Sequence, residues 1–358
     1  MIHAVKVSFF IYKSLFIYKS LFYIEVSILS LTGGRRRIMI FVNFLVLVIG
    51  FAALIKGADL FVDGSAALAR KFHVPSLIIG LTIVALGTSA PELAVSTTAA
   101  LNHSNEIALS NVIGSNMFNL LVVLGFCALF SPVPVSSEII KRDFPMSILM
   151  TVLVLVFGGG LIAGKAAGST VGMISRPEGL ILLIVFAVYM FLLVRSAMHS
   201  QTEEEAVQED ISLRKCFFLI VVGIALIVAG GQAVVNSAKS IAYFFGMSET
   251  LVGLTIVAVG TSLPELVTSI VASRKHENGL AVGNVVGSNM FNIMFILGTT
   301  AVLNPLPVTF ELSVNLLFLL LISAVTFVFV TTGKQLNRAE GAIMCMMYVG
   351  QAVFSIMG

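Results

Sequence analysis

The sequence predicts an all-α polytopic membrane protein in which ten transmembrane helices form two inverted five-helix repeats. Of its 358 residues, 58% are hydrophobic and only 11% are charged, with a mean hydropathy of +1.04. A soluble domain carries about 25% charged residues. Several apolar runs approach the ~20 residues that cross a bilayer core. In addition, residues 80–93 (GLTIVALGTSAPEL) and 253–266 (GLTIVAVGTSLPEL) are nearly identical.

The apolar runs that follow Met39 define the expected spans. These runs are continuous and not alternating, which favours helices over the strands of a membrane barrel. The connections between them are short. The expected spans are 41–63, 75–101, 106–130, 144–164, 178–195, 216–236, 249–273, 278–303, 312–331 and 339–356.

The duplicated blocks divide these spans into two sets of five. A second pair of copies, SNVIGSNMFN at 110–119 and GNVVGSNMFN at 283–292, has the same offset of 173 residues as the first pair. A unit with an odd number of spans crosses the membrane in opposite directions in its two copies, so the repeat is expected to be inverted. The expected organisation is a first repeat at 39–195, an acidic linker at 196–214 and a second repeat at 215–358.

Residues 1–38 differ from the rest of the chain. The hexamer IYKSLF occurs twice in tandem, and Arg35, Arg36 and Arg37 stand just before Met39. One interpretation is an additional hydrophobic or signal-like segment. We favour another, in which 1–38 is a doubtful extension, translation starts at Met39 and the Gly/Arg run reflects a purine-rich ribosome-binding region.

Basic residues in the connections predict the orientation, because cytoplasmic loops are enriched in Lys and Arg. If residue 39 starts outside, eleven basic residues fall in inside loops and three in outside loops. Both termini are therefore expected outside, with the linker 196–214 in the cytoplasm, in a bacterial plasma (inner) membrane. The linker is expected to be a solvated connection, with a calcium-regulatory role as the alternative. The inside residues are Arg70, Lys71, Lys141, Arg142, Arg195, Arg214, Lys215, Arg274, Lys275, Lys334 and Arg338, and the outside ones are Lys165, Arg176 and Lys239.

Each copy of the first block places a glutamate inside an apolar span, where a lone charge is costly and marks a functional site. In the first copy, Thr88 and Ser89 precede Glu92 by four and three residues, on one face of a helix. Pro91 removes a backbone donor and should kink the segment. Carboxylate, hydroxyl and freed carbonyl oxygens suit hard cations such as Na⁺ and Ca²⁺. The second copy repeats these residues as Thr261, Ser262, Pro264 and Glu265.

The second block adds further oxygen ligands. It supplies Ser115 and Asn119 in the first copy and Ser288 and Asn292 in the second. The amide oxygen of asparagine is a good neutral ligand for Ca²⁺ or Na⁺.

A purely structural interpretation of the blocks is helix packing around a protonated glutamate. Around the ion site itself, Gly114 and Gly287 remove side-chain bulk and are expected to let helices approach closely. Twelve of the 14 positions agree between residues 80–93 and 253–266, including Thr, Ser, Pro and Glu together. This agreement favours an ion site.

Other polar residues give weaker signals. Lys56 is close enough in sequence to pair with Asp59 or Asp63, although the three could instead line a cytoplasmic access path. Paired Asp motifs, Ser/His dyads and an H-E-x-x-H motif are all missing from the sequence, so enzyme activity is not expected. The three cysteines are expected to be apolar filler: Cys127, Cys216 and Cys345.

The paired blocks closely resemble the α-repeats of the calcium/cation antiporter superfamily, and most of all prokaryotic sodium/calcium exchangers, over residues 41–358. The resemblance implies exchange of Na⁺ for Ca²⁺ by alternating access, with Glu92 and Glu265 binding the ions and no cofactor besides the transported ions. Ca²⁺/H⁺ exchange at the same site is the main alternative, and a passive cation channel is a second. By motif match, the ligands implied are main-chain oxygens at Ala85 and Ala258 and the side chains of Thr88, Ser89, Glu92, Ser115, Asn119, Thr261, Ser262, Glu265 and Ser288.

Asn292 departs from part of that superfamily, whose potassium-dependent branch and some archaeal members carry an acid there. The remaining two carboxylates neutralise one Ca²⁺ or two Na⁺, which weakens the case for K⁺ transport. The expected partners are Ca²⁺ and Na⁺, with H⁺ or K⁺ as alternatives, and the lipid bilayer. No nucleic acid is expected to bind, and the protein is expected to function as a monomer.

Overall fold

The computed structural model describes residues 33–159, 170–199, 212–247 and 258–357, in which ten helical segments follow the predicted order of spans. The predicted all-α fold of two inverted five-helix repeats is confirmed. Most of the doubtful extension and most of the acidic linker lie outside the described residues. Those two predictions, and the boundaries of the repeats, stay predictions.

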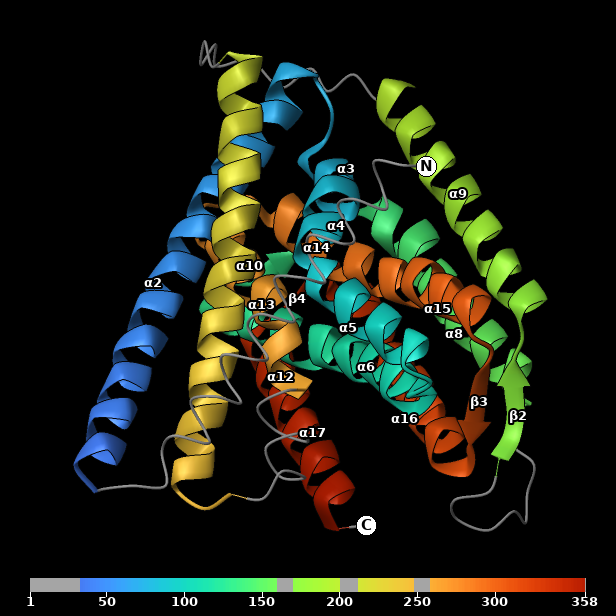
Figure 1. Ribbon diagram of the computed structural model, residues 1–358. Helices are drawn as coiled ribbons and strands as arrows, with labels where there is room; N and C mark the ends of the chain where they lie inside the picture. The colour runs from blue at the N-terminus through green and yellow to red at the C-terminus, as the bar shows by residue number, and fades with distance from the viewer. Residues whose placement is uncertain (1–32, 160–169, 200–211, 248–257, 358) are drawn as a thin grey trace, which may run out of the picture.

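The first repeat consists of α2 to α9 (Figure 1). Its elements are α2 (Gly33–Lys71), α3 (Ser76–Ile79), the π-helix η1 (Gly80–Val84), α4 (Ala85–Thr88), α5 (Ala90–Leu101), α6 (Asn105–Phe118), the π-helix η2 (Asn119–Val123), α7 (Leu124–Phe130), the strand β1 (Val133–Pro134), the π-helix η3 (Ile139–Asp143), α8 (Phe144–Phe157), the strand β2 (Thr170–Ile174) and α9 (Arg176–His199).

The second repeat consists of α10 to α17. Its elements are α10 (Leu213–Phe244), α12 (Ala258–Thr261), α13 (Leu263–Arg274), α14 (Asn278–Met290), the π-helix η5 (Phe291–Ile296), α15 (Leu297–Leu303), the strand β3 (Leu306–Thr309), α16 (Phe310–Gly333), the strand β4 (Gln335–Leu336) and α17 (Arg338–Met357).

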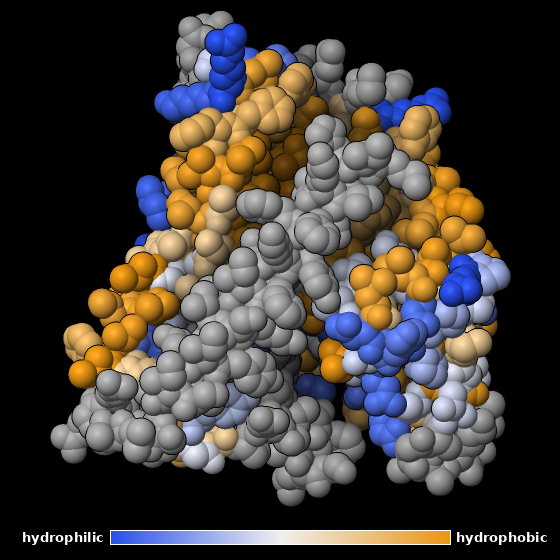
Figure 2. All heavy atoms as spheres, viewed as in Figure 1, coloured by the Kyte–Doolittle hydropathy of each residue, from blue (hydrophilic) through white to orange (hydrophobic). Residues whose placement is uncertain are grey.

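The surface fits a membrane environment. In the described residues, six single helices are long and apolar enough to cross a bilayer, and the bent pair Ser76–Thr88 and Ala90–Leu101 makes a seventh. The other spans are shorter or interrupted. Hydrophobic side chains cover much of the described surface in Figure 2, and hydrophilic ones gather mostly towards its upper and lower ends.

The long helices α2 and α10 pack lengthwise against each other at one side of the molecule (Figure 1). Glycines make this contact possible. A Cβ at Gly57 would lie 2.8 Å from the backbone nitrogen of Ile227, and one at Gly230 would lie 2.6 Å from that of Leu54. Small residues allow such close helix packing in a membrane. The other side of α2 exposes hydrophobic side chains such as Phe41, as lipid contact requires.

The centre of the molecule is built from the two copies of the second block. α14 is almost entirely buried and packs against α3 and η1 of the other repeat, and α6 is buried along most of the half that leads into η2. A Cβ at Gly287 would lie 2.7 Å from the carbonyl oxygen of Leu81, so the close approach expected there is confirmed. For Gly114 the same expectation stays a prediction, because the repeat-related counterpart of Leu81, residue 254, lies outside the described residues.

Two short antiparallel ladders tie the repeats together at their ends. β1 of the first repeat pairs with β4 of the second, and β2 of the first pairs with β3 of the second. The backbone groups of each strand are hydrogen-bonded to a strand of the other repeat, so either repeat alone would leave these groups without partners.

Candidate cation-binding site

Both glutamates of the duplicated block lie in the first turn of a helix that begins inside the molecule. α5 starts at Ala90 after a break at Ser89, and α13 starts at Leu263 after a break at Ser262. A proline at N1 or N2 of each helix suits this position, because its missing N–H would have no partner there. The positive end of the helix dipole favours a carboxylate in the first turn.

The break changes which residues face each other. The kink expected from Pro91 is confirmed, since the helices on either side of Ser89 are bent by 49°. The continuous helix expected to place Ser89 on the face of Glu92 is wrong, because Ser89 has non-helical angles of φ −83° and ψ 8°. Its hydroxyl turns instead towards the other repeat.

The two carboxylates are held by serines in a crossed arrangement. Ser89 Oγ donates to Glu265 Oε1 at 2.8 Å, and Ser262 Oγ donates to Glu92 Oε1 at 3.1 Å. All four residues have no exposed surface. Each repeat therefore positions the acid of the other, and the site exists only when the two halves are assembled.

Within the described ranges of the chain, four buried oxygens at the centre lack a hydrogen-bond partner. They are Glu92 Oε2, Glu265 Oε2, Asn119 Oδ1 and Asn292 Oδ1, two carboxylate and two amide oxygens at repeat-related positions. Among the described residues, no Lys, Arg or His forms an ion pair with either glutamate. Unpaired buried acceptors are costly, and a hard cation is the kind of ligand that would complete them.

Hydroxyls join the remaining ligand candidates into one network. Ser115 Oγ lies 3.1 Å from Ser262 Oγ, and Ser288 Oγ lies 3.4 Å from Thr88 Oγ1 and 3.5 Å from Glu265 Oε1.

Three further candidates lie around this network. Ala85 is buried one turn before Ser89. Thr261 is half-buried, and its hydroxyl donates to Asn111 Oδ1. Ala258 begins α12.

Three π-helical turns adjoin the site. η1 ends just before Ala85, η2 begins at Asn119, and η5 contains Asn292. A π-turn displaces backbone and side chains from their α-helical positions, which explains its frequency at functional sites. Hydrophobic periodicity does not reveal such turns, so they could not be predicted from the sequence.

Four asparagines of the second block were not predicted to act at the site. Asn284 Oδ1 accepts from Thr88 at 2.9 Å, and Asn111 Oδ1 accepts from Thr261 at 3.4 Å. Asn116 and Asn289 bond the side chains of the ligand candidates Asn292 and Asn119. The signal was available, because each pair occupies matching positions in the two copies.

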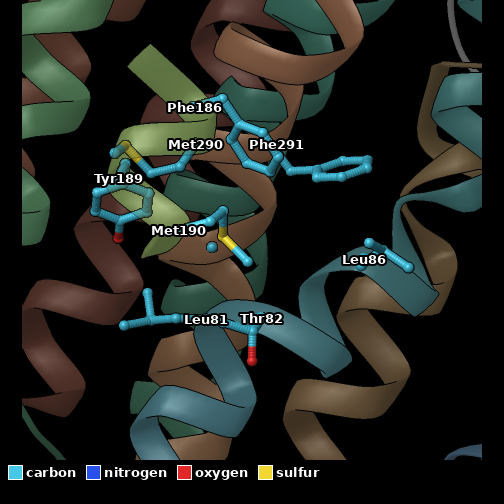
Figure 3. A pocket seen from close by; sticks show the side chains of 9 residues that line it. Leu81, Thr82, Leu86, Phe186, Tyr189, Met190, Met290 and Phe291 are labelled. Atoms are coloured by element: carbon cyan, nitrogen blue, oxygen red, sulfur yellow. The ribbon is translucent and has the colours of Figure 1, made fainter. Parts of the chain in front are cut away.

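Other groups singled out in the sequence lie apart from this site. Lys56 pairs with Asp59 at 2.7 Å, as expected, but Asp59 and Asp63 also pair with Lys275 at the end of α13. The three cysteines are free thiols. A small, mostly apolar pocket between η1, α9 and α14 (Figure 3) is lined by Leu81, Thr82, Leu86, Phe186, Tyr189, Met190, Gly287, Met290 and Phe291.

Comparison with known proteins agrees with this arrangement. The family profile described as "Sodium/calcium exchanger protein" matches residues 42–195 and 215–357. The sodium/calcium exchanger MaX1 of Methanosarcina acetivorans is 34% identical over 344 residues, covering 87% of this chain and 97% of the relative. The inner membrane protein YrbG of Escherichia coli is 35% identical over 270 residues, covering 72% of this chain and 79% of the relative.

Solved structures give the same result. The sodium-calcium exchanger NCX_Mj, soaked with 10 mM Na⁺ and zero Ca²⁺, superposes with a TM-score of 0.74 at 30% identity, covering 87% of this chain and 97% of that one. The fold, the duplicated blocks and the family profile agree over nearly the whole described chain. The protein therefore belongs to the sodium/calcium exchanger family and is an integral membrane cation/Ca²⁺ antiporter, a transporter and not an enzyme, whose ions are transported substrates.

Proposed function

We propose that this antiporter exchanges Na⁺ for Ca²⁺, and that Glu92 and Glu265 bind both ions in turn. The observation that carries the proposal is the crossed pair of buried carboxylates, each with one oxygen bonded to a serine of the other repeat and one oxygen without a partner. Two negative charges in a low-dielectric centre need a bound cation. Without a bound cation, the switch between the two access states is energetically unfavourable, which favours exchange over leak.

The ligand set of the proposed site follows the oxygens gathered at the centre. The two carboxylates bind Ca²⁺ or up to two Na⁺ without net charge, and a third Na⁺ would leave the site positive. Asn292 contributes a neutral oxygen, which argues against K⁺ as a co-substrate. The ligands proposed are the main-chain oxygens of Ala85 and Ala258 and the side chains of Thr88, Ser89, Glu92, Ser115, Asn119, Thr261, Ser262, Glu265, Ser288 and Asn292.

Alternating access is proposed to arise from movement of α2 and α10 together across the other helices. Their glycine contacts make the two helices one closely packed unit. The excess of basic residues in loops of one side supports a placement with both termini outside and the linker 196–214 in the cytoplasm of a bacterial inner membrane. All ligand candidates come from one chain, which supports function as a monomer.

The test is Na⁺-driven uptake of radioactive Ca²⁺ into inverted membrane vesicles. Glu92→Gln and Glu265→Gln should each reduce uptake to background, because the amide keeps the shape of the side chain but removes the charge. The matched control is Glu106→Gln, which alters an exposed glutamate at the start of α6. Uptake that persists in both central variants would reject this site.

Ca²⁺/H⁺ exchange is the second candidate, because the same two carboxylates could carry protons instead of Na⁺. Vesicles loaded to carry either a Na⁺ gradient or a pH gradient separate the two candidates. Ca²⁺ flux driven by Na⁺ at constant pH supports the main proposal. Flux driven only by the pH gradient would replace it with proton coupling at the same site.

A further inference from the structure

Asn119 and Asn292 can serve a cation in only one of two side-chain orientations. A primary amide presents either its oxygen, which attracts a cation, or its NH₂ group, which repels one. The two orientations have almost the same shape, so packing alone does not select between them. A hydrogen-bond partner on one side of the amide must make the choice.

The structure places an asparagine of the opposite repeat where that partner is needed. Asn292 Nδ2 donates to Asn116 Oδ1 at 3.1 Å, and Asn119 Nδ2 donates to Asn289 Oδ1 at 3.1 Å. In both cases the NH₂ group is occupied, and the amide oxygen is left buried and without a partner. These two oxygens join the unpartnered carboxylate oxygens of Glu92 and Glu265.

Asn116 is itself held in orientation. Its Nδ2 lies 3.5 Å from the backbone carbonyl oxygen of Asn289, a group that can only accept. This contact directs the Asn116 oxygen towards Asn292. The chain of dependence thus runs from a fixed backbone group, through Asn116, to the oxygen that Asn292 presents.

We propose that Asn116 and Asn289 are positioning residues, which turn the amide oxygens of Asn292 and Asn119 towards the transported cation across the interface between the repeats. The inference rests on the proposed function, because it assigns roles around that cation site. It adds two residues that are not ligands themselves but fix what the ligands present. A carboxylate has two equivalent oxygens and would need no such partner.

That last difference supplies the test. Asn116→Leu removes the acceptor, and the freed Asn292 amide can turn its NH₂ group inward. We expect about a tenfold rise in the half-saturating Ca²⁺ concentration, the effect of losing one oriented polar contact. In the N292D background the same substitution should have little effect, since either carboxylate oxygen can face the ion. The equivalent pair of the other repeat is tested in the same way, with Asn289→Leu compared in the unaltered protein and in the N119D background.

The measurement is Ca²⁺/Ca²⁺ self-exchange in proteoliposomes, which needs no counter-ion, together with Ca²⁺-induced thermal stabilisation of the purified protein. Asn116→Ala, which removes the acceptor and adds no bulk, runs in parallel in case the leucine variant does not fold. Thr326→Val, which alters a buried polar residue of α16 that is not among the proposed ligands or positioning residues, is the control for lost packing.

The outcomes separate the two proposals. A defect of Asn116→Leu that disappears in the N292D background supports the positioning role. A defect of equal size in both backgrounds, or no defect in either, would overturn it while leaving Glu92 and Glu265 as the ion site. Failure of the unaltered protein to exchange Ca²⁺ would overturn the proposed function, and the positioning role with it.

Discussion

Hydrogen bonds at the centre of the molecule come in repeat-related pairs, whereas two charged clusters nearer its ends have neutral residues at the repeat-related positions. The crossed bonds from Ser89 and Ser262 to the opposite glutamates form one central pair. Asn111 and Asn284 form another, each donating to a serine of its own repeat at 2.9 Å. In the proposed alternating access, an ion would meet equivalent groups from either side of the membrane.

The first asymmetry is a buried charged cluster at the start of α8. Asp143 is fully buried and accepts two hydrogen bonds from Arg142 and one from the Tyr189 hydroxyl. The corresponding residues of the second repeat are Asn315 and Leu316, so that half uses neutral packing at the same place.

The second asymmetry lies near the end of α13. Lys275 bonds Asp59 and Asp63 of α2, a group we call the Lys275 cluster, and Arg70 pairs with Glu277 nearby at 3.1 Å. The positions that correspond to the cluster at the other end carry Asn102, Gln232 and Asn236, all neutral. We infer that the symmetric central residues determine which ion is bound. The charged clusters near the ends would determine whether the conformation open to one side of the membrane or the other is more populated.

Asp143→Leu should give the largest effect, on stability and not on transport. It copies the second repeat but leaves Arg142 without its carboxylate, and breaking a buried ion pair costs ~3–5 kcal/mol. We expect about 3 kcal/mol, the lower end of that range, because Arg142 retains some access to water. Thermal unfolding in detergent measures the loss of stability. The half-saturating Ca²⁺ concentration in self-exchange should stay unchanged, because Asp143 is not a proposed ion ligand.

The double variant R142N/D143L copies the second repeat completely at this place. It should recover much of the lost stability, because no unpaired charge remains. If the double variant is as unstable as Asp143→Leu, the asymmetry does not reflect charge pairing.

The central symmetry is tested by Ser89→Ala and Ser262→Ala. Each removes one hydrogen bond to a buried carboxylate, worth ~1.5–3 kcal/mol, so the Ca²⁺ half-saturation should rise about tenfold or more in self-exchange. The two rises should agree within about threefold. Ser323→Ala, a buried serine of α16 that bonds only its own helix at 2.8 Å, is the control. A large effect in one variant alone would show that one glutamate dominates.

Much of this architecture could be predicted, because the hydrophobic composition and the internal repeat both depend directly on it. Apolar runs gave the spans, and the 173-residue offset gave the pairing of Glu92 with Glu265. Neither signal predicts that a serine bonds the acid of the other repeat, because that depends on how the halves meet in space. The break at Ser89 redirects its side chain by a local change of backbone angle, and the partner Lys275 is distant in sequence from Asp59.

A smaller effect is expected at the Lys275 cluster. Lys275→Met removes its ion pairs with α2, which as partly exposed contacts are together worth about 1 kcal/mol, or about fivefold in the balance between conformations. The reporter is Ser273→Cys in a background without native cysteines, a buried position that opening at this end would expose to a maleimide. Lys275→Met should raise the labelling rate about fivefold, whereas Asn102→Met should not change it.

Charge in the Lys275 cluster persists across the physiological pH range. Burial lowers the pKa of Lys275, but its hydrogen bonds to Asp59 and Asp63 raise the pKa above its usual value. Stability from such a raised pKa is lost only as pH rises past it. The labelling rate of any cysteine by a maleimide rises with pH, because the thiolate is the reactive form. The ratio of the rates of the Ser273→Cys reporter with and without Lys275→Met should therefore change little between about pH 6 and 9.

Among the conditions expected to change the labelling rate, high salt should give the smallest change. It also distinguishes the partly exposed ion pairs near the ends from the buried groups at the centre. At about 1 M ionic strength charges are screened within ~3 Å, so partly exposed pairs weaken while buried ones change little. Choline chloride should raise labelling of the Ser273→Cys reporter towards the level of Lys275→Met, by a factor of about two to three. It should not raise the rate further in Lys275→Met itself, because the pairs that salt screens are already gone. An equal response in both proteins would mean that salt acts elsewhere, and the ends would lose their proposed part in setting the favoured side.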